Sequence, residues 1–359
     1  MPLLFAMSIH QPGLAAESDA VARLKASQSC VACDLSDVDL RQFSLNTADL
    51  RGANLQRSDL RGVDLTGTLL YGADLRGTRL SDANLAKASL SRANFTHTDL
   101  SHQELPRGRL SYTQLVGARL IEANLRAANL SGSDLTGADL SRADLSEANL
   151  SQAQLTGAIM QQTRLAGAVL RSVDLTGVAT LQGADLSGGD LRHARLSGVD
   201  LSANDLSHAR LLKADLSSSK LTGARLVETE LKRADLRGAD LSQADLSGAR
   251  LVGAKLTGAN LRQARLVNVE IGGSLIDADF SGAEISRSSF AGANMKGVRI
   301  DGASLNAVDF SGANLYGVDF TGASLTHCIF RQANLRQARF TERQLRENNI
   351  ESELVSGSN

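Results

Sequence analysis

A large apolar residue returns at every fifth position through most of the chain. The spacing runs in fives from Leu35 to Leu175, from Leu181 to Ile271 and from Leu275 to Phe340, and each slot holds Leu, Phe, Ile or Met. A period of five matches neither the 3.6-residue period of an amphipathic helix nor the two-residue period of a strand. The pattern therefore predicts a repeat architecture in which each unit packs against its neighbours.

The repeat unit reads Ala-Asp/Asn-Leu followed by two variable residues, as in residues 138–142 and 259–263. We expect the central Leu and the small residue two positions before it to point inward, because two large side chains would not fit in one narrow coil. Glycine recurs two residues after Leu, where the chain must turn and where the missing Cβ is an advantage. The unit thus has two inward and three outward or turn positions.

These repeats resemble those of the pentapeptide-repeat family, and the resemblance covers roughly residues 31–340. It implies an all-β solenoid, a right-handed quadrilateral β-helix in which four pentapeptides form one coil of 20 residues. We expect about 15 such coils, stacked at roughly 4.8 Å as hydrogen-bonded strands are. Short helical caps are expected at both ends, because an open coil end presents unpaired strand edges.

The outward charges support a 20-residue coil independently. Residues one coil apart on one side alternate in sign: Asp190, Arg210, Glu230, Arg250 and Glu270. Like charges on neighbouring strands are destabilising, so this register is favoured, although Asp39 over Asp59 and Asp185 over Asp205 are exceptions. One extra residue at 178–180 is offset by one missing at 272–274, which predicts two local bulges in a continuous rod.

The last coils have a different filling. Phenylalanine recurs at multiples of ten, at residues 280, 290, 310, 320, 330 and 340, which places these rings inside the coil on two opposite sides. Asn294, Asn314 and Asn334 fall on one side and predict an amide ladder.

Four segments follow from these patterns. Residues 1–17 are a signal-like or disordered segment with a cleavage site near Ala16, and residues 18–29 form a capping helix that begins at Ser18. Residues 30–340 form the β-helix, and residues 341–359 form a C-terminal cap and tail. The signal-like segment favours export to the periplasm, with a cytoplasmic location as the alternative.

The C-terminal cap begins with a capping-box sequence from Thr341 to Gln344. Leu345, Ile350 and Leu354 follow it and form either the cap itself or a dimer contact. We therefore expect a monomer or a homodimer joined through this cap.

Cys30 and Cys33 form the one motif with chemical potential. The repeat count places both inward, so they are either a buried thiol pair or, if the protein is exported, a structural disulfide. Redox catalysis needs an exposed thiolate of low pKa, which this setting does not favour. A zinc site would need two further ligands, and the nearest histidines, His10 and His97, are distant in sequence.

Charge and composition exclude several classes of partner. The net charge is −1, with 38 basic and 39 acidic residues, so no bulk field attracts nucleic acid or an anionic membrane. No run of 18 apolar residues predicts a membrane span. Histidine, serine and aspartate form no catalytic constellation. We predict no catalytic residues, no cofactor and no bound metal.

Two functions remain for such a chain. The first is a non-enzymatic structural or protein-interaction rod without a small-molecule site, whose protein partner the sequence does not name. Its candidate contact is the least polar group of outward residues, Tyr71, Tyr112, Val116 and Ile121. The alternative comes from the quinolone-resistance branch of the family, whose members mimic duplex DNA and bind the topoisomerase gyrase.

Overall fold

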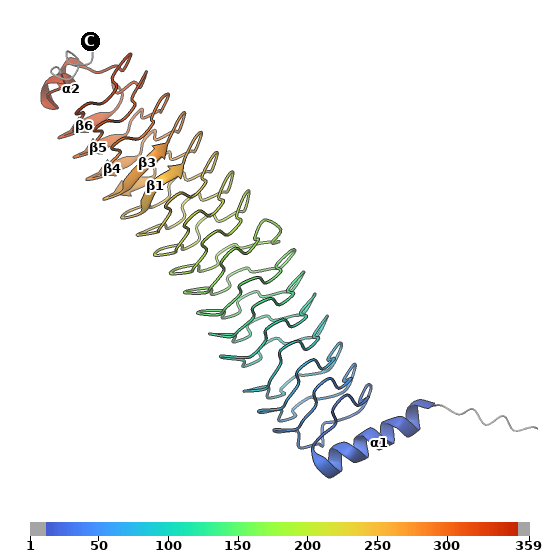
Figure 1. Cartoon of the computed structure of the whole chain (residues 1–359). Helices are drawn as coiled ribbons and strands as arrows, with labels where there is room; N and C mark the ends of the chain where they lie inside the picture. The colour runs from blue at the N-terminus through green and yellow to red at the C-terminus, as the bar shows by residue number, and fades with distance from the viewer. Residues whose placement is uncertain (1–11, 351–359) are drawn as a thin grey trace, which may run out of the picture.

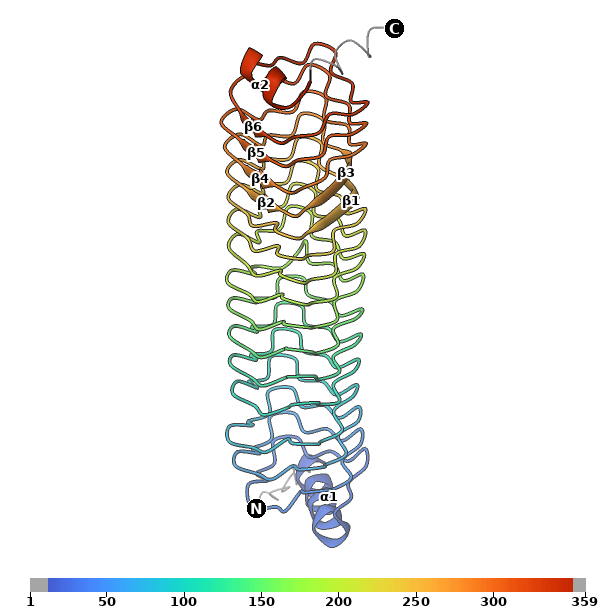
Figure 2. The same cartoon turned by 90° about the vertical axis from the view of Figure 1, so that its left-hand side faces the viewer.

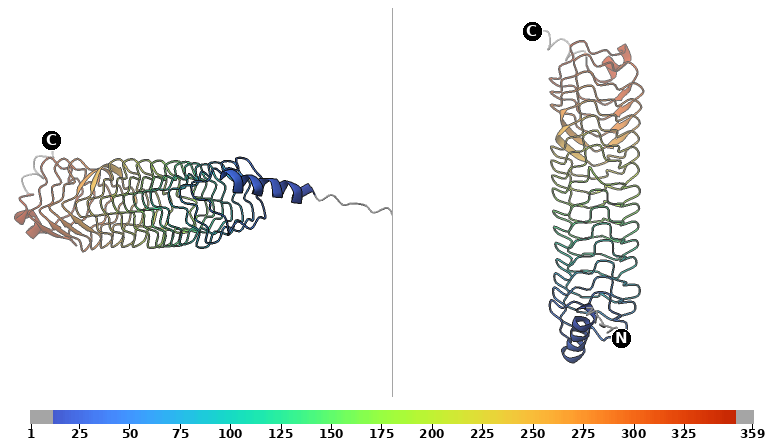
Figure 3. Two further views of the ribbon diagram at one scale, coloured as in Figure 1. Left: turned by 90° about the horizontal axis from the view of Figure 1, so that it is seen from below. Right: turned by 90° about the vertical axis from the view of Figure 1, so that its right-hand side faces the viewer.

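The protein forms a long solenoid that winds from helix α1 at one end to helix α2 at the other (Figure 1). The computed structural model describes residues 12–350, and the apolar segment at residues 1–11 and the tail containing Leu354 lie outside the described residues. Views from other sides show the same stack of coils along the whole rod (Figure 2, Figure 3). The β-solenoid fold that the sequence predicts is therefore confirmed.

Each pentapeptide contributes one side and one turn. In a representative unit, Ala138 and Leu140 are fully buried, and Ser141 and Arg142 form the turn that Ala143 closes by donating its N–H to the Leu140 carbonyl at 3.0 Å. Arg142 has φ of 57°, because the third residue of a type II turn must have positive φ. This conformation costs about 1–2 kcal/mol for a residue other than glycine, an amount comparable to the gain from burying one Leu.

The coils stack in parallel with a 20-residue register. Asp49 bridges Leu69 in the next coil, and the same spacing holds on every side except at the two slips. At those places Ile159 bridges Thr180 and Asn260 bridges Asp279. Four columns of bridging residues define the four sides. Side 1 begins Ser29, Asp49, Leu69; side 2 begins Asp34, Asn54, Asp74; side 3 begins Asp39, Asp59, Arg79; side 4 includes Asp64 and Asn84.

Longer strands appear near the C-terminal end of the rod. Strands β1 (Arg250–Lys255) and β3 (Glu270–Ser274) begin on side 1 and pair with each other. Side 4 carries a sheet in the order β2-β4-β5-β6, formed by β2 (Arg265–Val267), β4 (Glu284–Ser286), β5 (Ser304–Asn306) and β6 (Ser324–Thr326). The β1–β3 pair contains a register shift between Val252 and Ala254, which is the second slip of the sequence repeat.

The core near the C-terminus contains the two aromatic stacks that the sequence predicts. Phe290 stacks on Phe310 with ring centroids 5.5 Å apart, and Phe320 stacks on Phe340 at 4.7 Å. The rings of the two stacks meet edge to face, an arrangement that aromatic pairs favour. Larger side chains thus fill the core at this end of the rod.

The predicted amide ladder is also present on side 2. Asn314 donates to Asn294 at 3.1 Å, and Asn334 donates to Asn314 at 2.9 Å. Inside the rod, polar residues in the small inward slot are satisfied in a similar way. Thr68, for example, donates its hydroxyl to the Leu45 carbonyl of the preceding coil at 2.7 Å. Other inward hydroxyls donate within their own turn, as Ser58 does to the Leu55 carbonyl at 2.8 Å, so a buried hydroxyl finds an acceptor in either way.

Helix α1 (Pro12–Ser27) packs on the first coils of the rod through a short apolar stripe. Ala20 and Leu24 are buried, and the Lys25 ammonium lies 5.3 Å from the centre of the Phe43 ring. The sequence places the start of this helix at Ser18, which is wrong: the helix begins earlier, at Pro12. Proline is favoured at the first helical position because its missing N–H has no partner there in any case.

Helix α2 (Glu342–Glu347) closes the other end and has the predicted capping box. Gln344 is buried and donates its side-chain amide to the carbonyls of Phe320 and Ala323, both at 2.8 Å. Asn348 accepts the Cys328 N–H at 2.9 Å, and Ile350 is fully buried. These contacts satisfy backbone groups of the last coil, so α2 acts as a cap, while the homodimer stays a prediction. Neither α1 nor α2 has the length and apolar content that crossing a bilayer requires.

Ion pairs between and within coils stabilise the outer surface. The carboxylate of Asp190 is buried on side 1 and lies 2.7 Å from Nε of Arg192. Burial disfavours the ionised form of Asp190, but hydrogen bonds from Arg192 and Arg171 outweigh it and lower its pKa to about 2. A folded-state pKa below the usual value means that this carboxylate stabilises the fold above about pH 4 and loses that effect as the pH falls toward 2.

Substitution of Gly273, the glycine at the second slip, is expected to destabilise the fold more than substitution of the other turn glycines. Its φ is +117°, outside the left-handed region that other residues occupy in this rod, and an added Cβ would lie 2.5 Å from the Ala254 carbonyl oxygen. We expect Gly273→Ala to reduce the free energy of unfolding by about 2–4 kcal/mol. Gly258→Ala is the control, because Gly258 has φ of +67° and open space around it, and should cost about 1 kcal/mol. Equal losses in urea unfolding would contradict this.

Asp190→Asn should destabilise the rod in a pH-dependent way. We expect a loss of about 2 kcal/mol at pH 7, because a pKa shift of one unit corresponds to about 1.4 kcal/mol. The difference from the unaltered protein should shrink as the pH falls from 4 to about 2, the pKa of Asp190. Asp134→Asn is the control, since the repeat carries Asn at the same position of side 2 in Asn54 and Asn94. A pH-independent loss at Asp190 would show that packing alone is responsible.

Candidate functional site

Three recesses lie on side 3, each where two successive coils separate. Side 3 lacks, among the described residues, the bridges that would join Arg79 to Asp99, Thr180 to Asp200, and Arg299 to Asp319. A recess opens at each of these places. Side 1, opposite, is bridged without interruption from Ser29 to Ile329. The coils therefore open locally on one side while the opposite side holds them together.

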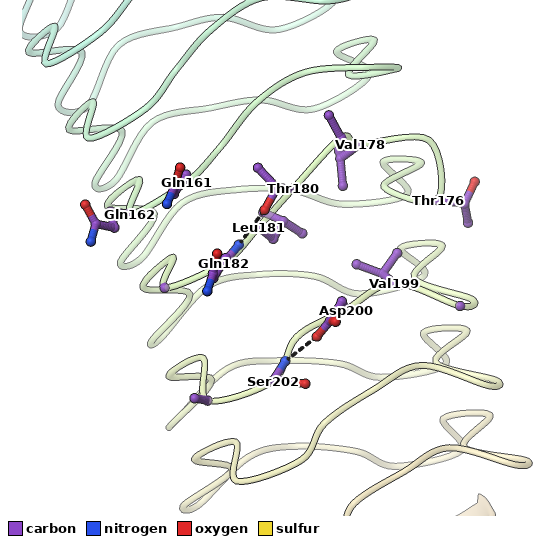
Figure 4. A pocket seen from close by; sticks show the side chains of 14 residues that line it. Gln161, Gln162, Thr176, Val178, Thr180, Leu181, Gln182, Val199, Asp200 and Ser202 are labelled. Carbon is purple, nitrogen blue, oxygen red and sulfur yellow. Dashed lines mark hydrogen bonds between the residues drawn. The ribbon is translucent and has the colours of Figure 1, made fainter.

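The largest recess, about 830 Å³, lies at the extra residue of the first slip (Figure 4). Its walls combine amides and hydroxyls, such as those of Gln161, Gln182 and Thr180, with the aliphatic side chains of Val178, Leu181 and Val199. Asp200 is its carboxylate, and hydrogen bonds from Ser202 hold the pKa of Asp200 below its usual value. An ionised carboxylate already committed to a backbone N–H is a poor proton donor or acceptor near pH 7. The recess offers polar surface but no acid–base pair.

The recess of about 420 Å³ between Leu80 and Glu104 holds the nearest approach to a catalytic grouping. His102 directs Nδ1 at Glu122, 3.3 Å away on the next coil, and not at the Ser101 hydroxyl. Burial alone would raise the pKa of Asp99, but hydrogen bonds from Ser101 outweigh this effect and hold the pKa of Asp99 below its usual value. A nucleophilic serine needs a base within about 2.6–3.2 Å, and this arrangement does not provide one. Within the described residues, no group of three or more side chains could hold a metal ion.

The predicted surface contact residues separate in the structure. Tyr71 and Tyr112 lie on the same edge of the rod, and the Arg92 guanidinium lies between them, 5.9 Å and 5.8 Å from the two ring centres. Val116 and Ile121 are half-buried in the next two turns along the chain, on different edges. The structure thus joins the two tyrosines through Arg92, a residue that the sequence alone did not single out.

This tyrosine–arginine–tyrosine column is exposed and sterically defined. Tyr71 is 44% and Tyr112 is 56% exposed, so both rings present a face to solvent. A Cβ added at Gly132 would lie 2.5 Å from the Tyr112 ring, so glycine on the next coil leaves room for that ring. Cation–π contacts at exposed sites contribute about 0.5–1 kcal/mol each, enough to hold the side chains in a preferred stack.

The tyrosines belong to a larger surface, which we call strip 1. Strip 1 consists of each bridging residue of side 1 and two turn residues. These two turn residues follow the inward residue that comes directly after the bridging residue, and they lead to side 2. All six large apolar residues that are exposed in the described chain lie on it: Val31, Leu69, Tyr71, Tyr112, Val252 and Ile329. An even distribution over four sides would place one or two there, so exposed apolar surface is concentrated on one side of the rod.

Strip 1 also differs in charge from the rest of the rod. Its basic residues number eleven: Arg51, Arg92, Arg109, Arg171, Arg192, Arg210, Lys213, Lys232, Arg233, Arg250 and Arg331. Its acidic residues number five: Asp49, Asp190, Glu230, Glu270 and Asp309. The other repeat residues between 29 and 340 include 23 basic and 28 acidic ones. The near-zero net charge of the chain therefore conceals a positive strip on a slightly negative rod.

The comparison with protein families agrees with this architecture. The family model described as pentapeptide repeats matches residues 29–102 and 113–342 in successive segments. Among solved structures, HetL, a pentapeptide repeat protein involved in heterocyst differentiation regulation in Nostoc sp. strain PCC 7120, is 32% identical, with 68% of this chain and 96% of HetL covered and a TM-score of 0.25.

Two further solved structures are similar to this chain. QnrB1, a plasmid-mediated fluoroquinolone resistance protein, is 18% identical over 54% of this chain and 89% of its own, with a TM-score of 0.31. A pentapeptide repeat protein of the Arabidopsis thaliana thylakoid lumen is 29% identical over 39% of this chain and 70% of its own, with a TM-score of 0.16. A search of curated proteins finds no match. The family match, which extends over most of the chain, shows that the protein belongs to the pentapeptide repeat family.

Proposed function

We propose that the protein is a non-catalytic rod that binds another protein through strip 1. The observation that carries this proposal is the confinement of all six exposed large apolar residues of the described chain to this one strip. Exposed apolar residues scattered over all sides need no explanation, but their alignment along one side of the rod favours an interaction surface on that side.

The composition of strip 1 fits a protein partner. Tyrosine and arginine are the residues in which binding energy concentrates at protein interfaces, and Tyr71, Arg92 and Tyr112 stack together at its N-terminal part. The unbroken ladder of side 1 holds the strip rigid, so little conformational entropy is lost on binding. The recesses of side 3, by contrast, mix polar and apolar groups, whereas small-molecule sites are lined predominantly by apolar ones.

The charge distribution argues against the gyrase-binding alternative. A DNA mimic needs a continuous negative surface, because duplex DNA carries phosphate charge along its whole length. Here acidic residues are neutralised column by column: Asp59 pairs with Arg61, and Asp279 lies 3.1 Å from Arg299. Strip 1 is positive, and the three other sides mix both signs.

Site-specific photo-cross-linking tests the binding surface. We expect a photoreactive phenylalanine analogue at Tyr71 or Tyr112, introduced in the native host, to form a discrete cross-linked species with another protein. The physical reason is that both positions are exposed on the proposed contact. Gln243, an exposed turn residue on side 3, is the matched control. Cross-linking that is absent at both tyrosines, or equal at Gln243, would refute the proposal.

The compartment decides which partners are available, and the cysteines report it. Cys30 and Cys33 are buried and joined by a disulfide in the structure. Structural disulfides persist in oxidising compartments, so we expect protein purified from its host to gain two hydrogens in mass on denaturation and reduction. Cys328, buried and unpaired, serves as the internal control for alkylation under the same conditions. Alkylation of all three thiols without reduction would indicate a reducing compartment and a cytoplasmic partner.

A further inference from the structure

We propose that the part of strip 1 between residues 190 and 253 binds an acidic segment of the protein partner, with carboxylates interspersed with apolar residues. This inference rests on the proposed function and names the chemistry of its partner. The binding surface is the basic ladder, defined as Arg192, Arg210, Lys213, Lys232, Arg233 and Arg250.

The charges within this part of the strip are unbalanced. Across the same coils, strip 1 carries two acidic residues, Asp190 and Glu230, against the six basic ones. Both are already engaged by arginine: Asp190 with Arg171 and Arg192, and Glu230 with Arg210 at 3.7 Å. The carboxylates of this surface therefore cannot neutralise the remaining cations.

Four cations of the ladder are exposed and unpaired, Arg250 among them, and the other three lie close together in the turns. Lys213, Lys232 and Arg233 are all exposed, and none forms an ion pair with another described residue. The Lys213 N–H donates to the Lys232 carbonyl at 3.1 Å, so the three side chains start from adjoining turns of successive coils. Arg233 passes its stem over Gly253, where an added Cβ would lie 3.4 Å from its Cγ.

Stacked like charges are uncommon at the third residue of the turn. At the third residue of the turn, neighbouring coils pair opposite charges, as in Arg142 with Glu122 at 2.7 Å and Arg57 with Asp37. Lys213 and Arg233 occupy this position on successive coils and repel each other. Lys87 and Arg107 form a second like-charged pair at this turn position. They lie in the turns that lead from side 4 to side 1, at the opposite edge of side 1 from the turns of strip 1. Repulsion of this kind is relieved when an anionic partner lies across both charges.

The apolar neighbours of the ladder favour a protein segment over nucleic acid. Val252 is 43% exposed, and Leu212 is half-buried; both lie in the same turn column as Arg192 and Lys232. Phosphate backbones need basic residues and gain little from aliphatic side chains, whereas an acidic peptide with apolar residues would use both. Coils about 4.8 Å apart offer one contact per coil to an extended segment that lies along the rod.

Fluorescence anisotropy with defined probes tests the inference. The probes are a fluorescein-labelled peptide of about 20 residues that alternates glutamate and leucine with serine, a poly-L-glutamate of the same charge, and a duplex DNA. We expect the mixed peptide to bind best and Lys213→Glu with Arg233→Glu to weaken its binding at least about tenfold, a free-energy change of about 1.4 kcal/mol. Binding should also weaken as salt is raised, because exposed charges are screened.

The matched control is Lys296→Glu with Arg336→Glu, two exposed basic residues of the turns after side 2. The fold should tolerate Lys213→Glu and Arg233→Glu, since Glu122 and Glu228 already occupy the same turn position with positive φ. Binding that is unchanged in the first variant, equally weakened in the control, or stronger for DNA than for the mixed peptide would overturn the inference. Cross-linking at Tyr71 and Tyr112 reports the proposed function separately, because neither position is exchanged here.

Discussion

The stacking of one inward Leu per side in a fixed 20-residue register is the constraint on which the rest of the structure depends. It aligns each outward residue with the residues one coil before and after it, at about the spacing of hydrogen-bonded strands. A charge on the surface therefore has predetermined neighbours, and the sequence must either pair it or accept repulsion. Asp190 with Arg210 and Arg142 with Glu122 are pairs of this kind. The surface is consequently a set of columns, and function must be sought in columns that depart from the pairing rule.

The sequence predicts most features that follow from this register. The phenylalanine stacks, the ladder from Asn294 to Asn334 and the capping box at Thr341 all depend on period or on local chain geometry, which can be read directly. The start of α1 at Pro12 could not be read in the same way, because several residues before Ser18 are also compatible with a helix. The role of Arg92 does not follow from the sequence alone, because it depends on two tyrosines from the coils on either side and Arg92 is itself not apolar.

The two slips show how independent the four sides are. One extra residue near Thr180 shifts the register on side 3 and opens a recess there, yet side 1 stays bridged through the same coils. In Gln103 and Asn204, an amide occupies the small inward slot beside two of the recesses and donates to the Leu80 and Leu181 carbonyls, at 3.1 Å and 2.9 Å. A longer polar side chain between coils thus accompanies the opening of the outer ladder, while the buried Leu residues keep the stack continuous.

Net charge is a poor guide to the surface of such a rod. A globular domain mixes distant sequence segments on each face, but here every fourth pentapeptide falls on the same side. A modest excess of basic and apolar residues in the pentapeptides of one side therefore accumulates along the whole rod. That bias places eleven basic residues and all six exposed large apolar residues of the described chain on strip 1, while the chain as a whole has a charge of −1. Because strip 1 is also the side whose ladder is unbroken, its charges and rings keep fixed spacings. A partner that matches those spacings gains from many weak contacts held in register, which suits an extended protein surface better than a compact ligand.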